Sequence, residues 1–545
     1  MQDSRTKENR KAGGKLVKGA MIIGAAGVLV KVLGAFFRIP ITNWMGADGM
    51  AYYGFAYAIY GMLLVIATAG IPVAISRLVS ENIAQKRYRN AHQVFHISLI
   101  LMTSLGTVLF VVAFFGAGFF TTLMGNPDAR LAVRAISPAL FFVPIVATFR
   151  GYFQGRQNMN PTAVSEITEQ FWRIVSGLLF TYIFLKASLI KAAAGAAAGA
   201  AVGSGFAFLL LLLIYGLNKR AIAYKVERYD PTIDSRKSIA KQIVVIAVPI
   251  ILGSLIMPIM NLIDTGLIMR RLQATGFSFQ ESNHLYGLIS SYCSTLIGFP
   301  QIFTQAVAIS LVPAIAKRAA MQDGEGVRAH VETSYRLTTF LAFPCAVGMF
   351  VLAEPILHLL YPANPEECQE ALAPLMILAI SIIGLALSQT STGVLQSIGR
   401  QNVPVIHLLA GALLKIVLTY ILVGIRPLNI KGAAISTICA YTLAALWNDR
   451  SVVRYTGIRF PYKQIYLKPL AASLVMGLCA YGAHRGLARL LPSFLATVLA
   501  ILLGVIVYAF CALLIKAVRP EEVGELKGGD RINRAIQKIL PSWEA

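Results

Sequence analysis

Two cationic side chains, Lys31 and Arg38, lie inside the first long apolar segment of the chain. A charge at membrane depth is costly and is rarely kept unless it faces water, a partner or a ligand. Residues seven apart on a helix differ by almost two whole turns and share one face. We therefore expect this face to line a polar cavity in which the two cations can bind an anion.

A second group of charges occupies another apolar segment, where Glu166, Glu169 and Arg173 fall on one helical stripe. Glu169 and Arg173 are spaced to pair within the helix, which lowers the cost of burying both. Such a pair either fixes helix packing or contacts a ligand, and the sequence leaves both interpretations open. Lys415, in a further apolar segment, has no carboxylate nearby in sequence.

Acidic and amide groups are fewer in these segments, and Asn261 and Asp264 are candidates for ion binding or gating. The substrate-binding candidates are the cations and carboxylates Lys31, Arg38, Arg173, Lys415, Glu169 and Glu166. A cavity lined mainly by cations suits an anion, and diphosphate fits because Lys and Arg bind phosphate by charge-assisted hydrogen bonds. Outward movement of an anion is favoured by about 2.3 kcal/mol per charge per 100 mV of inside-negative potential.

The composition explains why these charges are at membrane depth. Of the 545 residues, 57% are hydrophobic and only 14% are charged, which predicts an all-α integral membrane protein. Apolar stretches of spanning length recur about fourteen times along the chain. The expected spans are 16–41, 51–73, 93–120, 130–151, 162–185, 187–217, 239–269, 284–315, 330–353, 371–397, 403–424, 429–447, 465–486 and 492–517.

The formal net charge of +24 could suggest a nucleic-acid partner, but its distribution follows the topology of a membrane protein. Basic residues concentrate before Leu16 and in the loops 219–241 and 450–468, which we expect to be cytoplasmic. An even number of spans returns the C-terminus to the same side. We therefore expect a multi-pass plasma-membrane protein with both termini in the cytoplasm and no nucleic-acid partner.

Targeting, redox and catalytic signals are sparse. The first apolar run is too long for a cleaved signal peptide and ends in Phe-Arg-Ile-Pro, so we interpret it as a retained span. The six cysteines show no CxxC spacing, and neither a disulfide framework nor a metal site is expected. No phosphate-loop, HExxH or GxSxG motif occurs, so we expect neither an enzyme nor a cofactor.

The chain repeats itself after six spans. Val73–Ser76 recurs as Val307–Ser310, and Gly155–Asn158 recurs as Gly399–Asn402, a motif whose simplest local role is to end a helix. Arg173-Ile-Val matches Lys415-Ile-Val in the following span. Three matches in order indicate two pseudo-symmetric six-helix lobes followed by two additional helices.

The repeat gives the expected organisation of the chain. It consists of a basic tail at 1–15, an N-lobe at 16–220, a loop at 221–238, a C-lobe at 239–447, two further spans at 465–517 and an amphipathic cytoplasmic tail at 518–545. The displacement pairs Asp264 with Lys31. Prolines 249, 258, 300, 313 and 344 are candidate bending points. The Ala- and Gly-rich run 192–205 predicts close helix packing.

Several of these segments resemble a known family. Phe37-Arg38-Ile39-Pro40, the run Ala74–Glu81 and Phe299-Pro300 are similar to the polysaccharide-exporter branch of the multidrug/oligosaccharidyl-lipid/polysaccharide superfamily. More narrowly, they resemble the Gram-positive group that contains lipid II flippases and stage V sporulation protein B. The resemblance covers essentially the whole chain.

This resemblance implies a fourteen-helix, two-lobed, MATE-like flippase in the bacterial plasma membrane. Its cargo would be undecaprenyl-diphosphate-linked peptidoglycan precursor, lipid II, moved from the inner to the outer leaflet by alternating access, with Lys31 and Arg38 in a cationic central cavity. Its expected partners are the lipid-linked glycan, membrane lipids and cell-wall synthesis proteins. Some relatives bind sodium through acids in helices 7, 11 and 12, but span 11 has none here.

Two other functions remain open at this stage. A cation-coupled multidrug exporter of the same helix plan would favour acids over Lys31 and Arg38 in its cavity. A non-transporting scaffold for envelope synthesis or sporulation would not need intramembrane cations at all.

Overall fold

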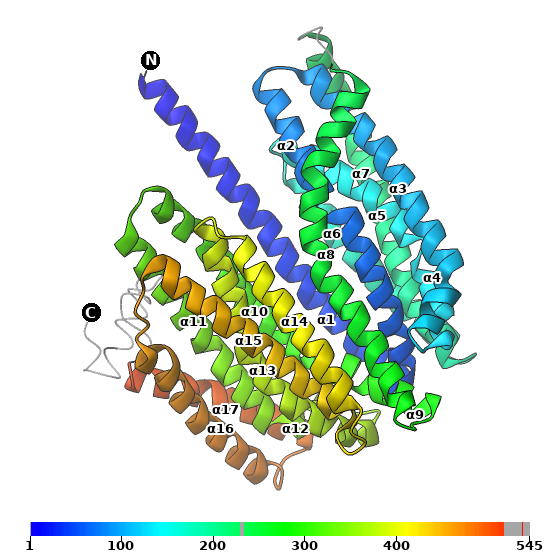
Figure 1. The fold of residues 1–545 in the computed structure, drawn as a ribbon, viewed down its shortest axis with the longest axis vertical. Helices are drawn as coiled ribbons and strands as arrows, with labels where there is room; N and C mark the ends of the chain where they lie inside the picture. Colours follow the sequence, from blue (N-terminus) through cyan, green and yellow to red (C-terminus); the bar gives the residue numbers. More distant parts are fainter. Residues whose placement is uncertain (1, 229–233, 517–536, 538–545) are drawn as a thin grey trace. The chain divides into compact units, whose positions relative to one another are not determined.

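The computed structural model describes residues 2–228, 234–516 and 537, and within these ranges it is helical with no strand (Figure 1). Contacts divide the chain into two compact units, Met1–Ser291 and Tyr292–Ala545. Each unit is described by itself below. Long apolar runs without side-chain hydrogen-bonding groups fold this way because a helix satisfies its own backbone in lipid.

The first unit contains the helices that carry most of the predicted site residues. They are α1 (Gln2–Thr68), α2 (Ile71–Ala84), α3 (Tyr88–Leu123), the 3-10 turn η1 (Pro127–Ala129), α4 (Arg130–Ile136), α5 (Ala139–Gly155), α6 (Asn160–Leu185), α7 (Leu189–Arg228), α8 (Arg236–Ala274) and α9 (Phe279–Gly287).

The second unit begins inside a π-helical turn, η2 (Leu288–Cys293), which joins α9 to α10. Its helices are α10 (Ser294–Ala320), α11 (Gly324–Val351), α12 (Ala353–Leu360), α13 (Pro365–Ser397), α14 (Asn402–Val423), α15 (Asn429–Thr456), the π-helical turn η3 (Lys463–Leu467), α16 (Lys468–Leu487) and α17 (Ser493–Leu514).

These helices account for the fourteen expected spans. Twelve helical segments of the described residues are long and apolar enough to cross a membrane. The first of them, Ala26–Ala84, contains two helices that meet at a kink. The remaining span is α6, in which Glu166, Glu169 and Arg173 raise the charge content. The protein is therefore a multi-pass membrane protein.

Four interruptions shape the long helices. Gly46 has φ 61° and ψ −168°, a conformation essentially restricted to glycine, and it divides α1 between the first two spans. The second span is broken again at Gly70, and the fourth is divided at Pro138 between α4 and α5. The fourth interruption is η2. By contrast, α8, α10 and α11 continue through the prolines that the sequence marked as bending points.

The close contact between α6 and α7 confirms the packing predicted from the Ala- and Gly-rich run. A Cβ added to Gly199 would lie 2.6 Å from the Arg173 carbonyl oxygen, and one added to Gly203 would lie 2.4 Å from that of Glu169. Only glycine permits this approach. The contact fixes the backbone of the α6 segment that carries the charged stripe.

In the second unit, α13 packs against α10, α11 and α15, and α15 also packs against α14. The two additional spans, α16 and α17, pack on each other, and α16 contacts α11. Buried side chains such as Tyr335 and Leu395 form the core between these helices.

The observed units differ from the lobes expected from the repeat. Helix α8 lies in the expected C-lobe 239–447, but it packs on α1, α2 and α3 of the first unit. A reason is visible at Gly70, where an added Cβ would be only 2.3 Å from the Ala247 carbonyl oxygen. The contacts thus divide the chain after Ser291 rather than at 221–238. The six-plus-six division remains a proposal about the repeat.

The structure supports the register of the repeat at its second and third motifs. Helix α5 ends at Gly155 and α13 ends at Ser397, so both copies of the Gly-Arg-Gln-Asn motif lie at helix ends, as predicted. The next helices start at Asn160 and Asn402, and Arg173 and Lys415 each lie thirteen residues further along. The two cations therefore occupy the same position in corresponding helices.

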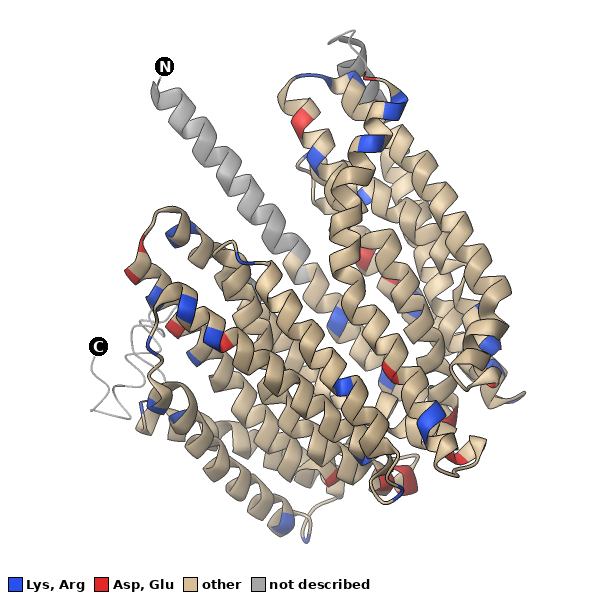
Figure 2. Cartoon of the chain, viewed as in Figure 1, with Lys and Arg blue, Asp and Glu red and all other residues tan. Residues whose placement is uncertain are grey.

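Charged residues gather toward the ends of the helices, while the middle of most helices is uncharged (Figure 2). This is the pattern expected of helices that cross a lipid core. The predicted amphipathic tail at 518–545 lies outside the described residues, apart from Gln537.

Candidate functional site

Arg173 is held by aromatic residues of α1. Its Nη2 donates a hydrogen bond to the Tyr57 hydroxyl, and its guanidinium carbon lies 4.9 Å from the centre of the Tyr57 ring. The Tyr53 ring is 4.4 Å from that of Tyr57. Cation–π attraction and a hydroxyl acceptor offset part of the cost of a buried charge.

One Arg173 donor remains available. Its Nε is buried, and it has no hydrogen-bond partner among the residues that the structure describes. A buried donor without an acceptor is unfavourable by about 1–3 kcal/mol. An anionic group that reached this nitrogen would remove the penalty and gain a charge-assisted hydrogen bond.

Glu169 does not pair with Arg173, which corrects the pairing expected within α6. Its Oε2 instead accepts a hydrogen bond from Nη2 of Arg150 on α5 at 2.8 Å, and Arg150 Nε donates to the Ser165 hydroxyl at 2.9 Å. The two side chains are 17% and 23% exposed. The neighbouring helix and the Tyr57 ring offer better partners than the i, i+4 geometry of one helix. Glu166 lies within electrostatic reach of Arg150 as well.

Arg38 and Asp264 both lie close to one buried tyrosine. The hydroxyl of Tyr286, on α9, is within electrostatic reach of both side chains and donates a hydrogen bond to the Thr265 hydroxyl at 3.2 Å. Three elements therefore meet here: α1, α8 and α9. The repeat had paired Asp264 with Lys31, whereas the structure brings it toward Arg38. Asn261, one turn earlier on α8, is exposed.

Lys31 is exposed on α1, and Gly34 and Phe37 are among the residues between it and Arg38 in the sequence. A Cβ on Gly34 would lie 3.3 Å from Gln170 of α6, and Phe37 packs against Gly177 of the same helix. The predicted cationic face therefore borders the contact between α1 and α6.

The predicted site residues thus fall into two groups. Lys31, Arg38, Arg173, Glu166, Glu169, Asn261 and Asp264 belong to the first unit, and Lys415 lies half-buried on α14 of the second. Sequence reasoning missed the partners Tyr57, Arg150 and Tyr286. Tyr53, Tyr57 and Tyr60 did carry a signal, because their spacing puts them on one helical stripe. The described residues contain no group of three or more His, Cys, Asp or Glu arranged to hold a metal ion.

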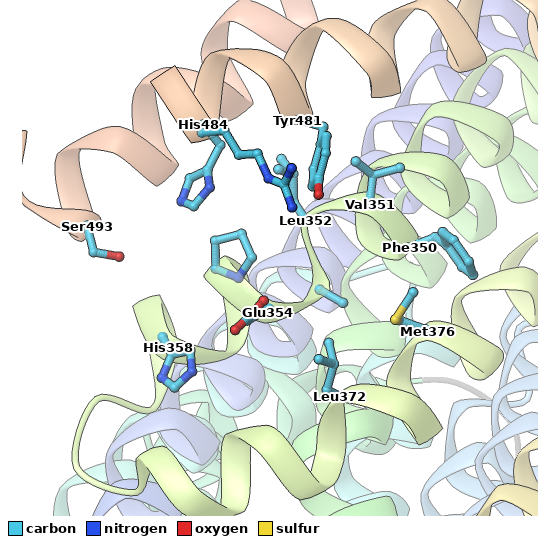
Figure 3. Close-up of a pocket in the computed structure, with 13 residues that line it drawn as sticks. Phe350, Val351, Leu352, Glu354, His358, Leu372, Met376, Tyr481, His484 and Ser493 are labelled. Atoms are coloured by element: carbon cyan, nitrogen blue, oxygen red, sulfur yellow. The ribbon is translucent and has the colours of Figure 1, made fainter. Parts of the chain in front are cut away.

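A separate pocket of about 390 Å³ opens in the second unit, between α12, α13, α16 and the start of α17 (Figure 3). Glu354 and His358 of α12 face His484 of α16 across it, and Arg485 also lines it. Glu354 Oε1 accepts a hydrogen bond from Gln369 at 2.9 Å. None of the site residues predicted from the sequence lines this pocket.

Residues 16–319, more than half of the chain, match the protein family described as "Polysaccharide biosynthesis protein". The chain belongs to this family. The matched range includes every predicted site residue of the first unit. A second family, MatE, matches residues 288–421 and includes Lys415.

Similarity to individual proteins extends over most of the chain. The chain is 26% identical over 483 residues to the lipid II flippase MurJ of Bacillus subtilis, covering 85% of this chain and 87% of that protein. It is 26% identical over 465 residues to stage V sporulation protein B of the same organism, covering 85% and 88%. These relatives are transporters or sporulation proteins rather than members of an enzyme class.

The fold matches a solved structure of the lipid II flippase MurJ in an inward closed conformation. The TM-score is 0.67 at 16% identity, covering 91% of this chain and 98% of that one. The MATE-like, fourteen-helix architecture expected from the sequence is therefore confirmed.

Proposed function

We propose that this protein is a flippase that moves a polyprenyl-diphosphate-linked oligosaccharide, specifically lipid II, from the inner to the outer leaflet by alternating access. The observation that carries the proposal is the similarity to the B. subtilis lipid II flippase over 85% of the chain. The intramembrane cations support it, because a diphosphate supplies the negative charge that they require.

In this proposal the cations of the first unit have different roles. Lys31 and Arg38 bind the diphosphate from α1. Arg173 presents its unpartnered Nε while Tyr57 holds the rest of the guanidinium. Glu166 and Glu169 stay with Arg150 and limit the net positive charge of the region. Lys415 is proposed to bind the same cargo because it occupies the Arg173 position of the second repeat.

The experiment is complementation of a bacterial strain depleted of its own lipid II flippase. Wild-type protein should restore growth and cell shape, and Lys31→Ala with Arg38→Ala should reduce rescue by tenfold or more, on the order of the loss of a charged hydrogen-bond pair. Lys191→Ala is the matched control because Lys191 is exposed at the start of α7. Membrane levels of each variant should be equal by immunoblot.

Failure of well-expressed wild-type protein to rescue would contradict lipid II as the cargo. Full rescue by the double variant would contradict the cationic mechanism.

A second candidate function is cation-coupled multidrug export, which the MatE match to residues 288–421 favours. It would use Asp264 as the coupling group. Asp264→Asn would then abolish drug resistance in an efflux-deficient strain, whereas the flippase proposal expects no resistance from the wild-type protein. A scaffold function would predict rescue by variants that lack every intramembrane cation.

A further inference from the structure

A large groove in the second unit lies apart from the residues considered so far. Its volume is about 1160 Å³, and it lies along α13, α15 and the segment that follows α15. Ile380, Ile383 and Leu387 of α13 form one apolar wall, and Leu446 and Val453 of α15 form the other. Ile380 and Leu446 are 47% and 60% exposed, so the groove opens at the surface of this unit.

Two arginines stand at one end of the groove. Arg450 and Arg454 are one turn apart on α15 and therefore share a face. Neither makes an ion pair or hydrogen bond with any residue in the described part of the chain. Asp449 also lines the groove, and its carboxylate accepts hydrogen bonds from the hydroxyls of Tyr335 at 2.6 Å and Tyr466 at 3.5 Å.

The length of the groove matches one leaflet of a bilayer. Its α15 wall extends from Thr442 to Arg454, which is about 18 Å at 1.5 Å per residue. Half of the hydrocarbon core is about 15 Å. The α15 side of the groove, with the two arginines included, is therefore about as long as one leaflet. Trp447 and Tyr462 also line the groove, and aromatic residues of this kind are common at the membrane interface.

From this geometry we infer that the groove is a binding site for an anionic phospholipid of the bilayer. The lipid phosphate lies between Arg450 and Arg454, and one acyl chain lies along Ile380, Ile383 and Leu446. Two guanidinium groups bind a phosphate by charge-assisted hydrogen bonds. Arg459, Lys463 and Lys468 follow in the segment between the end of α15 and the start of α16, and such a basic segment favours an anionic membrane surface. The inference does not depend on the proposed cargo.

The test measures phosphatidylglycerol binding to the purified full-length protein by native mass spectrometry. Arg450→Ala with Arg454→Ala should weaken binding by roughly tenfold or more, which corresponds to about 1.4 kcal/mol. Arg459→Ala is the matched control, because it removes an exposed arginine that follows α15 and does not line the groove. Equal binding by the double variant and wild type, or equal loss in the control, would overturn the inference.

A second pair of variants tests the apolar wall without changing charge. Leu446→Trp should fill the groove and reduce lipid binding by a similar factor, whereas Leu413→Trp, at an exposed position of α14 outside the groove, should not. Melting temperatures of both variants must match wild type, and an unfolded Leu446→Trp is replaced by Ile380→Trp. Equal lipid binding by both tryptophan variants would show that the apolar wall does not contact the lipid.

Competitors distinguish the possible sources of the phosphate. Inorganic phosphate at equal concentration should not displace phosphatidylglycerol, because it lacks the chain. If it does displace the lipid, the site recognises a free anion and the inference fails. If undecaprenyl diphosphate displaces the lipid and its own binding is lost in the double arginine variant, the groove belongs to the cargo instead.

Discussion

The intramembrane charges of the first unit are stabilised by partners from other helices. Arg173 lies over the Tyr57 ring, and Glu169 pairs with Arg150 at 2.8 Å. Each contact lowers the cost of a charge in lipid. A charge in a span of this protein therefore contributes to helix packing as well as to the proposed binding of an anion.

The Arg150–Glu169 pair gives a prediction at this scale. Arg150→Ala should lower the unfolding free energy by about 2 kcal/mol, because it leaves a mostly buried carboxylate without its cation. Arg150→Ala combined with Glu169→Ala should be less damaging than the sum of the single variants, with a coupling of roughly 1 kcal/mol or more. Unfolding in detergent, followed by tryptophan fluorescence, measures both quantities.

The control cycle combines Arg173→Ala with Glu169→Ala. Since the structure gives these two residues different partners, their coupling should be close to zero. A coupling larger than that of the Arg150–Glu169 cycle would restore the pairing expected from the sequence.

Sequence reasoning found the charged residues but not their partners. The type and spacing of Lys31, Arg38 and Arg173 are visible along one chain, because an apolar run makes each charge conspicuous. The partner of Glu169 depends on how α5 packs on α6, and Arg150 lies near the end of its span, where a cation is ordinary. The i, i+4 rule describes neighbours on one helix only.

At the scale of elements, glycines decide how closely the helices pack. Gly199 and Gly203 of α7 bring its backbone against the carbonyls of α6, while a Cβ on Gly205 of the same helix would make only an ordinary van der Waals contact with Phe142. Gly203 and Gly205, which the sequence does not distinguish, thus have different environments in the fold.

This difference predicts opposite outcomes for two alanine substitutions. Gly203→Ala should destabilise the protein by about 1–3 kcal/mol, because its Cβ would meet the Glu169 carbonyl oxygen at 2.4 Å. Gly205→Ala should change stability by no more than about 0.5 kcal/mol, since the nearest atom, in Phe142, is 3.9 Å away. Melting temperatures in detergent compare the two. Equal effects would contradict the observed α6–α7 contact.

Acid sensitivity should arise where α3 meets the start of α8. Asp234 accepts hydrogen bonds from Arg87 at 2.7 Å and from Asn90 at 2.8 Å, and these bonds hold the pKa of Asp234 below its usual value. A carboxyl whose pKa is lower in the folded state stabilises it at pH values above about 3.9. That contribution should persist from pH 7 to pH 5 and disappear as the pH falls through the folded pKa.

The measurement is a melting temperature series from pH 7 to pH 3. Asp234→Asn should be less stable than wild type at pH 7 and should approach it at the acidic end. Glu325→Gln, at an exposed position at the start of α11, is the control and should stay parallel to wild type. A constant gap between Asp234→Asn and wild type would show that the carboxylate charge is not involved.

For the whole molecule, the even number of spans, fourteen, predicts that both termini lie on the same side of the membrane. Following the basic loops, we expect the turn at Gln322 and Asp323, between α10 and α11, to face the cytoplasm. The turn at 361–364, between α12 and α13, should face outward, because Glu354–Glu370 contains four glutamates and no Lys or Arg. A phosphatase reporter inserted at the second position should be active and one at the first inactive. If the first reporter were active and the second inactive, the expected membrane orientation, including that of both termini, would be reversed.

The overall plan could be predicted because span length and hydropathy are local properties of the sequence. The twofold register was also predictable from Arg173 and Lys415. The break at Gly46 falls between the expected spans 16–41 and 51–73, whereas the break at Gly70, inside the second expected span, was not predicted, since one glycine in an apolar run rarely marks a break. The grouping of α8 with the first unit depends on contacts between distant segments such as Gly70 and Ala247, which no repeat reveals.

The π-helical turn η2 has a consequence for how this polypeptide can be dissected. Because the division between the units lies at Ser291 and Tyr292, inside a spanning helix, no loop separates them for a protease to cut. Co-expressed gene fragments split within 229–233 would leave α8 on a different polypeptide from the helices on which it packs. Reassembly would then require α8 to find α1, α2 and α3 from another chain.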